Sequence, residues 1–254
     1  MIPPSLIDEV LNELRQEIQQ QRSTLAEALD AYLPLPPTAI FFGVAEDRLP
    51  VLLDLANPVV GSLLIMGDAG SGKTRLLRLV ARALIQTKDA AQVRFTVITH
   101  NPDEWKDMVR SPHCEGVFIA SETKAADMLY SLAARGHADY DKSFTLLFLD
   151  GLSLVDSLDY EIRLHTQWLL ARGPKRRIWP IVTYTPRYGE MMHPWTGIFR
   201  THLFARIADS RQVQRLEQVL SLPSEPPFGE LHAGRDYALP ENNHWLRFWI
   251  PPED

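Results

Sequence analysis

The chain has 254 residues, a formal net charge of −6 and one cysteine, Cys114, and 45% of its residues are hydrophobic. This composition is that of a globular protein, and it excludes a wholly disordered chain, an internal disulfide framework and a cysteine-based zinc site. The acidic balance also argues against a general polycation for nucleic acid, while a local basic patch stays compatible with it.

No apolar run reaches the ~18–20 residues that a membrane helix needs. The N-terminus becomes acidic at Asp8 and Glu9 and does not resemble a signal peptide. We therefore expect a soluble, cytoplasmic protein.

Residues 5–32 carry apolar side chains at helical spacing, with Ser5 as a candidate N-cap. This pattern predicts a long amphipathic helix that either packs on its own domain or binds a partner. Residues 33–37 contain three prolines and predict a stiff linker, because proline continues neither a helix nor a sheet. We expect an N-terminal helical extension with its linker over residues 1–37 and one domain over residues 38–254.

Beyond the linker, apolar runs typical of buried strands alternate with helical stretches. The apolar runs are residues 51–55, 62–66, 93–99, 116–120, 144–149 and 178–184. The helical stretches are residues 73–86, 103–109, 124–135 and 159–172. A strand at 202–208, a helix at 210–220, a proline-rich loop at 223–227 and a strand at 245–250 follow. This alternation predicts an α/β fold with a largely parallel sheet flanked by helices.

The segment Gly67-Asp68-Ala69-Gly70-Ser71-Gly72-Lys73-Thr74 matches the phosphate-binding pattern G-x-x-x-x-G-K-[ST] in full, between a predicted strand and a predicted helix. Its glycines let backbone N–H groups point at phosphate oxygens, and the helix N-terminus adds the positive end of its dipole. We predict that these residues and Arg75 bind ATP. Lys73 would reach the β- and γ-phosphates, and the Thr74 hydroxyl would ligate Mg²⁺.

Asp150 directly follows the most apolar run of the chain, residues 144–149. A carboxylate at the end of a strand near the phosphate-binding loop can hold the hydrated Mg²⁺ of a bound nucleotide. We therefore predict Lys73 and Asp150 as catalytic residues, and Thr74 and Asp150 as the metal site.

Gly151 stands where many P-loop ATPases carry a glutamate that polarises the attacking water. A positioned base contributes roughly 10²–10⁴-fold to a rate. We therefore expect ATP binding to be intact and hydrolysis to be slow.

Further segments resemble, in order along the chain, the FtsK/SpoIIIE/HerA-type motor ATPases, including the motor domains of type VII secretion ATPases. They are the lead-in at residues 43–55, Ser111-Pro112-His113, Ala133-Ala134-Arg135, residues 181–186, residues 204–210, Gly234-Arg235 and residues 247–251. The resemblance spans residues 38–254. It implies a RecA-like P-loop domain that uses ATP and Mg²⁺, forms a homo-oligomeric ring or assembles with related ATPase subunits, and acts on DNA or protein. Two positions depart from the family pattern: Gly151, and Tyr184 in place of the sensor glutamine.

The sequence leaves three functions open. The first is an ATP-driven motor, the second a catalytically degenerate module whose bound ATP stabilises an interface, and the third a regulatory or signalling ATPase of another P-loop class. A motor also needs an arginine finger that a neighbouring subunit supplies. The candidates are Arg135, Arg172, Arg200 and Arg206. The basic run at residues 175–177 precedes a predicted strand, so we expect it at the sheet edge away from the nucleotide.

Overall fold

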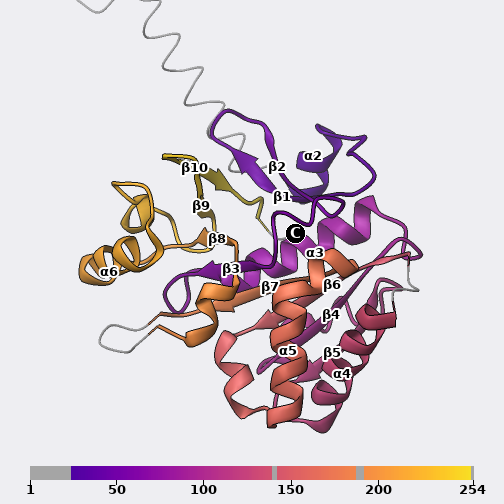
Figure 1. Cartoon of the computed structure of the whole chain (residues 1–254). Coiled ribbons are helices and arrows are strands. Elements are labelled where there is room, and N and C mark those ends of the chain that lie inside the picture. The colour runs from indigo at the N-terminus through magenta and orange to yellow at the C-terminus, as the bar shows by residue number, and fades with distance from the viewer. Residues whose placement is uncertain (1–23, 139–141, 187–191, 253–254) are drawn as a thin grey trace, which may run out of the picture.

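The computed structural model describes residues 24–138, 142–186 and 192–252. One ten-stranded sheet runs through the molecule in the order β2-β1-β10-β9-β8-β3-β7-β6-β4-β5, and helices flank it (Figure 1). The predicted α/β class, a RecA-like P-loop fold with a mostly parallel sheet, is confirmed.

One part of this sheet is parallel and carries the central strands. Its strands, in spatial order, are β8 (Thr201–Phe204), β3 (Leu63–Met66), β7 (Ile178–Tyr184), β6 (Phe144–Asp150), β4 (Val93–Thr99) and β5 (Cys114–Ile119). The crossover helices are α3 (Lys73–Thr87), α4 (Thr123–Ala138) and α5 (Tyr160–Arg172). Parallel strands with helices on both faces are buried on both sides, which explains why their sequences read as continuous apolar runs.

The other part of the sheet is antiparallel and comes from the two ends of the described chain. It contains β1 (Ala39–Ala45), β2 (Pro50–Asp54), β9 (Asp236–Glu241) and β10 (His244–Trp249). The hairpin of β1 and β2 corresponds to the expected lead-in. Strand β1 begins four residues before that lead-in, and β9 was missing from the predicted elements.

The predicted strand at 202–208 is too long, because β8 ends at Phe204. Past that point the chain runs along the loop that follows β3. The Ala205 N–H donates to the Met66 carbonyl, and the Arg206 carbonyl accepts from the Asp68 N–H. The end of this segment therefore supports the phosphate-binding loop.

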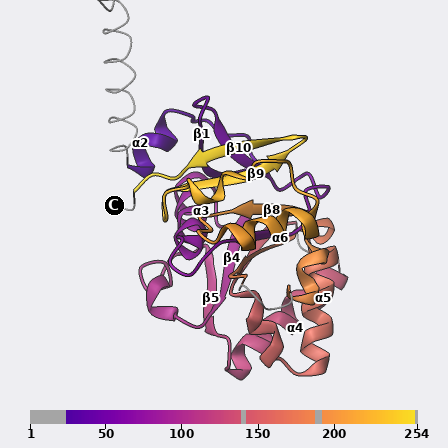
Figure 2. The ribbon, with the colours of Figure 1, turned by 90° about the vertical axis from the view of Figure 1, so that its left-hand side faces the viewer.

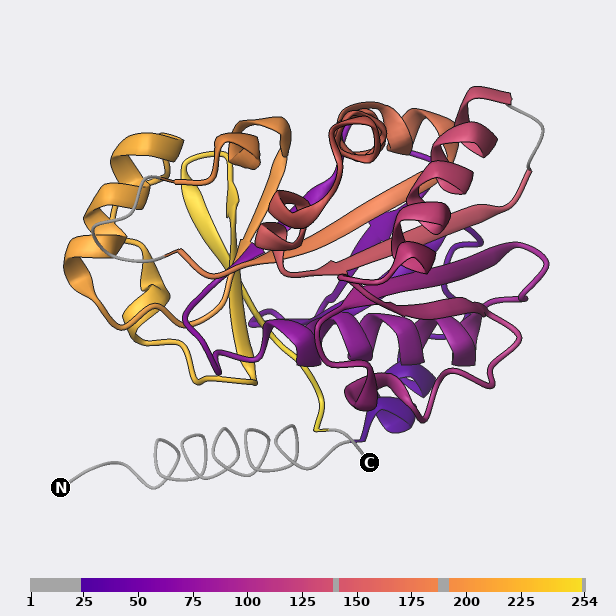
Figure 3. The same cartoon turned by 90° about the horizontal axis from the view of Figure 1, so that it is seen from below.

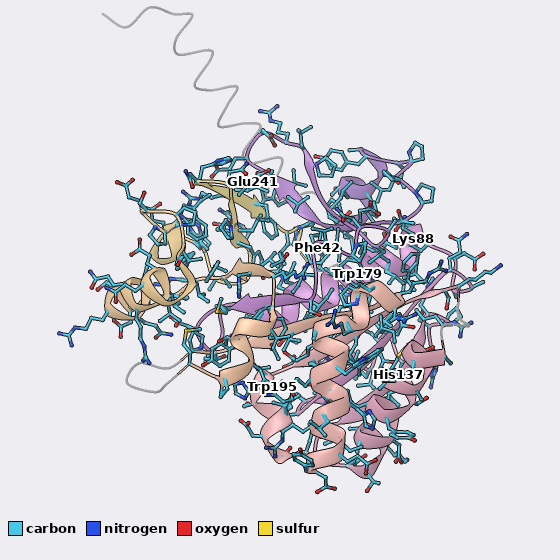
Figure 4. The ribbon with its side chains drawn as sticks, viewed as in Figure 1. Phe42, Lys88, His137, Trp179, Trp195 and Glu241 are labelled. Atoms are coloured by element: carbon cyan, nitrogen blue, oxygen red, sulfur yellow. The ribbon has the colours of Figure 1, made fainter. Side chains whose placement is uncertain are left out.

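Two apolar layers sandwich the sheet, with α3 on one face and α4 and α5 on the other (Figure 3). Helix α6 (Ser210–Leu220), predicted at these bounds, contributes Leu216 to the α4 and α5 side. Trp179 on β7 is fully buried and belongs to the α3 side (Figure 4).

The predicted helix at 103–109 is wrong. The chain forms a 3-10 turn, η1 (Pro102–Trp105), and then turns through residues 106–110. Trp105 and Met108 are both buried, and the Trp105 ring stacks on Phe148 at 5.7 Å between centroids. Two apolar side chains three residues apart fit successive tight turns as well as one helical face, so their spacing misled the prediction.

Within the range predicted as one helix, residues 5–32, Thr24 has an extended backbone (φ −67°, ψ 167°). Its hydroxyl accepts from the Glu27 N–H, and the Glu27 carboxylate accepts from the Thr24 N–H, so a capping box begins the short helix α2 (Leu25–Asp30). Leu25 and Leu29 pack into the core on the α3 side, at the end of the molecule where β1 and β10 lie (Figure 2). This part packs on its own domain, and residues 5–23 of the predicted helix lie outside the described residues.

Candidate functional site

The predicted phosphate-binding loop connects β3 to α3 at the carboxyl edge of the parallel strands. Gly70 and Gly72 have φ values of 74° and 96°, which L side chains rarely adopt. A Cβ on Gly72 would also lie 2.4 Å from the Gly234 Cα, so this close approach requires glycine at position 72. The loop curls as its sequence predicts.

Lys73, the first residue of α3, lies inside this loop and is only 9% exposed. Its Nζ donates to the Gly67 carbonyl at 2.9 Å and to the Asp68 carbonyl at 2.7 Å. Burial lowers the pKa of Lys73 to about 8, against the opposing pull of the Asp150 and Asp68 carboxylates. The ammonium therefore rests on two neutral carbonyls, which are weaker acceptors than phosphate oxygens.

Asp150 ends β6 and lies next to Thr74, as the sequence predicts. The Thr74 hydroxyl is 3.0 Å from each carboxylate oxygen. Two further hydroxyls donate to the same carboxylate: that of Thr183 at 2.9 Å and that of Thr99 at 3.4 Å. No motif in the sequence pointed to Thr99, and Thr183 was noted only as part of the segment at residues 181–186. The available signal was a threonine at or next to the carboxyl end of a mostly apolar strand, since such strand ends meet at one edge of the sheet.

The C-terminal segment packs directly on the loop. The Gly234 N–H donates to the Ser71 carbonyl, and the Tyr237 hydroxyl donates to the Gly72 carbonyl, both at 2.8 Å. The Arg75 guanidinium donates to the Gly234 carbonyl and, at 3.3 Å, to the Pro251 carbonyl. The Arg75 side chain therefore links the phosphate-binding loop to the C-terminal segment.

A groove of about 640 Å³ extends from Arg75 along β10 and the turn before β9. Its walls combine aromatic and aliphatic side chains with charged ones. The lining residues are Ala45, Glu46, Arg75, His232, Arg235, Asp236, Arg247, Phe248, Trp249, Ile250 and Pro252. Its volume and mixed lining suit a small organic ligand such as a nucleoside.

A second cavity, of about 450 Å³, opens on the other side of Arg75. It is lined by Thr74, Arg75, Arg78, Glu104 and Pro252. Glu104 lies in η1, where the sequence analysis assigned no functional residue.

The residues at the loop fit a nucleoside triphosphate with its metal ion. The Ser71 hydroxyl is buried and has no hydrogen-bond partner among the described residues. A buried hydroxyl without a partner is costly in an isolated protein, and a phosphate oxygen would satisfy it. The adjoining Thr74 hydroxyl and Asp150 carboxylate are the hard oxygen ligands that Mg²⁺ prefers.

The side of the site where water would attack departs from the family pattern. Gly151 has φ 128° and ψ 111° and offers no side chain next to Asp150. The Tyr184 hydroxyl accepts from the His193 N–H at 3.2 Å, so this phenol is bonded to the segment before η4 (Pro194–Ile198). The Asp156 carboxylate lies 3.1 Å from the His193 Nε2. The Tyr184 and Asp156 side chains thus both contact His193.

The four candidate arginine fingers lie at different edges of the sheet. Arg206 follows β8 at the carboxyl edge and is exposed. Arg135 lies in the last turn of α4 and forms a two-point pair with Glu115, at 2.9 Å and 2.8 Å. Arg172 and Arg200 lie near the starts of β7 and β8, at the opposite edge. The basic run at 175–177 precedes β7, as expected.

No family model matches the chain. Among curated proteins, the magnesium-chelatase subunit ChlI of Nostoc sp. is 35% identical over 94 residues, which are 37% of this chain and 25% of that protein. The ESX-3 secretion system protein EccC3 of Mycobacterium tuberculosis is 50% identical over 54 residues, 21% of this chain and 4% of that protein. The chain therefore spans a quarter or less of these relatives.

Solved structures match over nearly the whole chain. The cytoplasmic domain of the Thermomonospora curvata type VII secretion ATPase EccC has a TM-score of 0.66 at 19% identity, over 88% of this chain and 28% of that one. The pCW3 conjugation coupling protein TcpA, solved with ATPγS, has a TM-score of 0.63 at 14% identity, over 87% of this chain and 68% of that one. The fold is thus that of the motor ATPases that the sequence resembles. Across the described residues, no helix combines the length and apolarity needed to span a membrane.

Proposed function

We propose that the chain is an ATP-binding motor domain that couples ATP binding and slow hydrolysis to the movement of DNA or of a protein. The observation that carries this proposal is the contact of Thr74 with Asp150 at the mouth of a complete phosphate-binding loop. Two residues that are 76 positions apart meet where the metal of a bound nucleotide needs oxygen ligands. A glycine-rich turn without a ligand would not require this pairing.

Each residue of the site has a role in this proposal. The backbone N–H groups of residues 72–75, at the end of the loop and the start of α3, bind the phosphates, and Lys73 neutralises the β- and γ-phosphates. Thr74 and Asp150 hold Mg²⁺, which neutralises charge that develops on the phosphates. The groove beside Arg75 receives the base and ribose, with Trp249 and Ile250 as apolar contacts.

The proposal includes assembly into a ring, or with related ATPase subunits, in the cytoplasm. Lys73 and Mg²⁺ alone do not replace an arginine finger, which contributes roughly 10³–10⁵-fold. Arg206 is exposed at the edge that carries the nucleotide site. A neighbouring subunit can supply such a side chain across a subunit boundary. The fold match to the type VII secretion ATPase EccC and to the conjugation coupling protein TcpA supports a motor of this class.

A second candidate function is a nucleotide-binding module without turnover, in which ATP stabilises a subunit interface. Gly151 favours this candidate because it carries no carboxylate beside Asp150. The bonding of the Tyr184 hydroxyl to the His193 N–H favours it as well. Both candidates share the same ATP site and differ in turnover.

Calorimetry of Mg-ATP binding, followed by phosphate release with and without double-stranded DNA over a range of protein concentrations, tests the proposal. A motor binds ATP and shows specific activity that rises with protein concentration, because its site is completed in trans. Sedimentation with Mg-ATP should show a larger species than sedimentation without it. Binding without turnover supports the module, and absence of Mg-ATP binding contradicts both candidates.

A further inference from the structure

The cavity beside Thr74 has a carboxylate on its wall that the motif-based assignment leaves out. Among the described residues that line it, Glu104 is the one acid, and Thr74, Arg75 and Arg78 come from the start of α3. Thr74 is the hydroxyl that contacts Asp150. Glu104 therefore shares a cavity with the metal side of the site, and its side chain is only half buried.

Glu104 reaches this cavity from the strand next to Asp150. Strand β4 pairs with β6 in parallel, with Thr99 directly opposite Asp150. The Asn101 N–H donates to the Thr99 hydroxyl at 3.1 Å, and the Asn101 side chain donates to a Glu104 carboxylate oxygen at 2.8 Å. A continuous hydrogen-bonded path thus runs from Asp150 through Thr99 and Asn101 to Glu104.

The turn that carries Glu104 is anchored to the core. Trp105, the next residue, is completely buried and stacks on Phe148 in β6, two residues before Asp150. A rigid anchor on the strand that carries the metal ligand fixes the distance between the two carboxylates. Preorganised positions of this kind are what a catalytic group requires.

Two other acids at this edge of the sheet bond to other groups. An Asp68 carboxylate oxygen accepts from the Ala208 N–H at 2.8 Å, and Asp156 lies beside His193. Asp103 is next to Glu104 in the chain but does not line the cavity. Among the described residues, Glu104 is the acid that lines the cavity next to Thr74.

We propose that Glu104 is the general base of ATP hydrolysis and replaces the glutamate that Gly151 lacks; this inference rests on the proposed binding of Mg-ATP. The oxygen of a water molecule attacks the γ-phosphorus, and the bond from that phosphorus to the bridging oxygen breaks. ADP leaves with the bond electrons, and the Glu104 carboxylate takes the proton that the water loses. That proton then passes to the released phosphate or to solvent.

The test compares Glu104→Gln with its neighbour Asp103→Asn, which removes the same charge from the same turn. Glutamine keeps an oxygen that accepts from Asn101, so the turn is preserved while the base is lost. Two quantities are measured in each variant and in the wild type: turnover, and the affinities for ADP and for a non-hydrolysable ATP analogue by calorimetry.

Glu104→Gln should lower turnover by roughly 10²-fold or more, the contribution of a general base. It should also tighten binding of the triphosphate analogue about 3–10-fold, because a carboxylate near the γ-phosphate repels it, and leave ADP affinity unchanged. Asp103→Asn should keep both quantities within about 3-fold of the wild type.

Unchanged turnover in Glu104→Gln, an unchanged ratio of triphosphate to ADP affinity, or a wild type that binds ATP without turnover would each overturn this assignment and leave ATP binding standing. A wild type that does not bind Mg-ATP overturns the proposed function, and this assignment with it. The binding measurement on the wild type thus separates the two failures.

Discussion

The nucleotide site has two sides that follow from the sequence to different degrees. The phosphate side, from Gly67 to Thr74, is a continuous segment, and its distant partner Asp150 lies at the predicted place. The water side has Gly151 and Tyr184 where the family pattern has glutamate and glutamine. Phosphate binding depends mainly on one local backbone shape, whereas positioning of water depends on side chains from several separate strands. The groups that position water can therefore come from other segments of the chain while the phosphate-binding loop is unchanged.

The largest expected effect is on the phosphate side. Lys73→Ala removes two charged hydrogen bonds to phosphate oxygens, each contributing about 1.5–3 kcal/mol, and should weaken Mg-ATP binding roughly 10²–10⁴-fold. Calorimetry measures this, with Lys124→Ala on the exposed start of α4 as the matched loss of charge. Equal ATP affinity in Lys73→Ala and the wild type would show that Lys73 does not bind the phosphates of ATP.

Substitutions at Gly70 and Gly72 distinguish the energetic cost of an unfavourable backbone φ from the cost of a steric clash. At Gly72 a Cβ would lie 2.4 Å from the Gly234 Cα, and φ is 96°. At Gly70 φ is 74°, but nothing lies within 4 Å of such a Cβ. Gly72→Ala should cost about 3 kcal/mol or more of unfolding free energy, and Gly70→Ala about 1 kcal/mol. Urea titration measures both unfolding free energies. Equal losses would show that the segment around Gly234 does not pack tightly against Gly72.

The sequence predicted the phosphate-binding loop, its partner Asp150 and the central strands, but not the other contacts between the loop and distant segments. The loop, Asp150 and the central strands follow from motif and apolar runs. The packing of Gly234 and Tyr237 on the loop depends on tertiary approach, which no local pattern encodes. Strand β9 carries Pro240 and acidic residues at both ends, so its strand signal is weak. The capping box at Thr24 and Glu27 was readable, but the apolar stripe on both sides of it outweighed that signal.

Gly151 allows the water side to be tested directly. A Cβ there would meet Leu154 at an ordinary 3.5 Å, but φ is 128°, so the cost of a side chain comes from the backbone. Gly151→Ala and Gly151→Glu should each lose about 1–3 kcal/mol of unfolding free energy. Comparing the two variants isolates the added carboxylate from the shared backbone cost.

Turnover of Gly151→Glu should not exceed that of Gly151→Ala, because a second acid near Glu104 adds negative charge close to the γ-phosphate. Phosphate release on the two purified variants measures this. A Gly151→Glu variant faster than the wild type would mean that the water side still needs its glutamate at this position, and would count against Glu104.

The smallest expected effect is the pH dependence of ATP affinity. Burial lowers the pKa of Lys73 to about 8 in the ATP-free protein, so its ammonium is largely protonated at pH 7 and largely neutral at pH 9. Phosphate binding favours the charged form, and the bound state therefore holds more protons than the free state above pH 8. Affinity should fall about tenfold between pH 7 and pH 9, since the protonated fraction falls by that factor. Calorimetry in two buffers of different ionisation enthalpy should show proton uptake on binding in this range. Lys73→Arg, whose guanidinium stays charged at every pH tested, should bind with an affinity that is flat over the same range. A wild type as flat as Lys73→Arg would show that Lys73 does not titrate in this range.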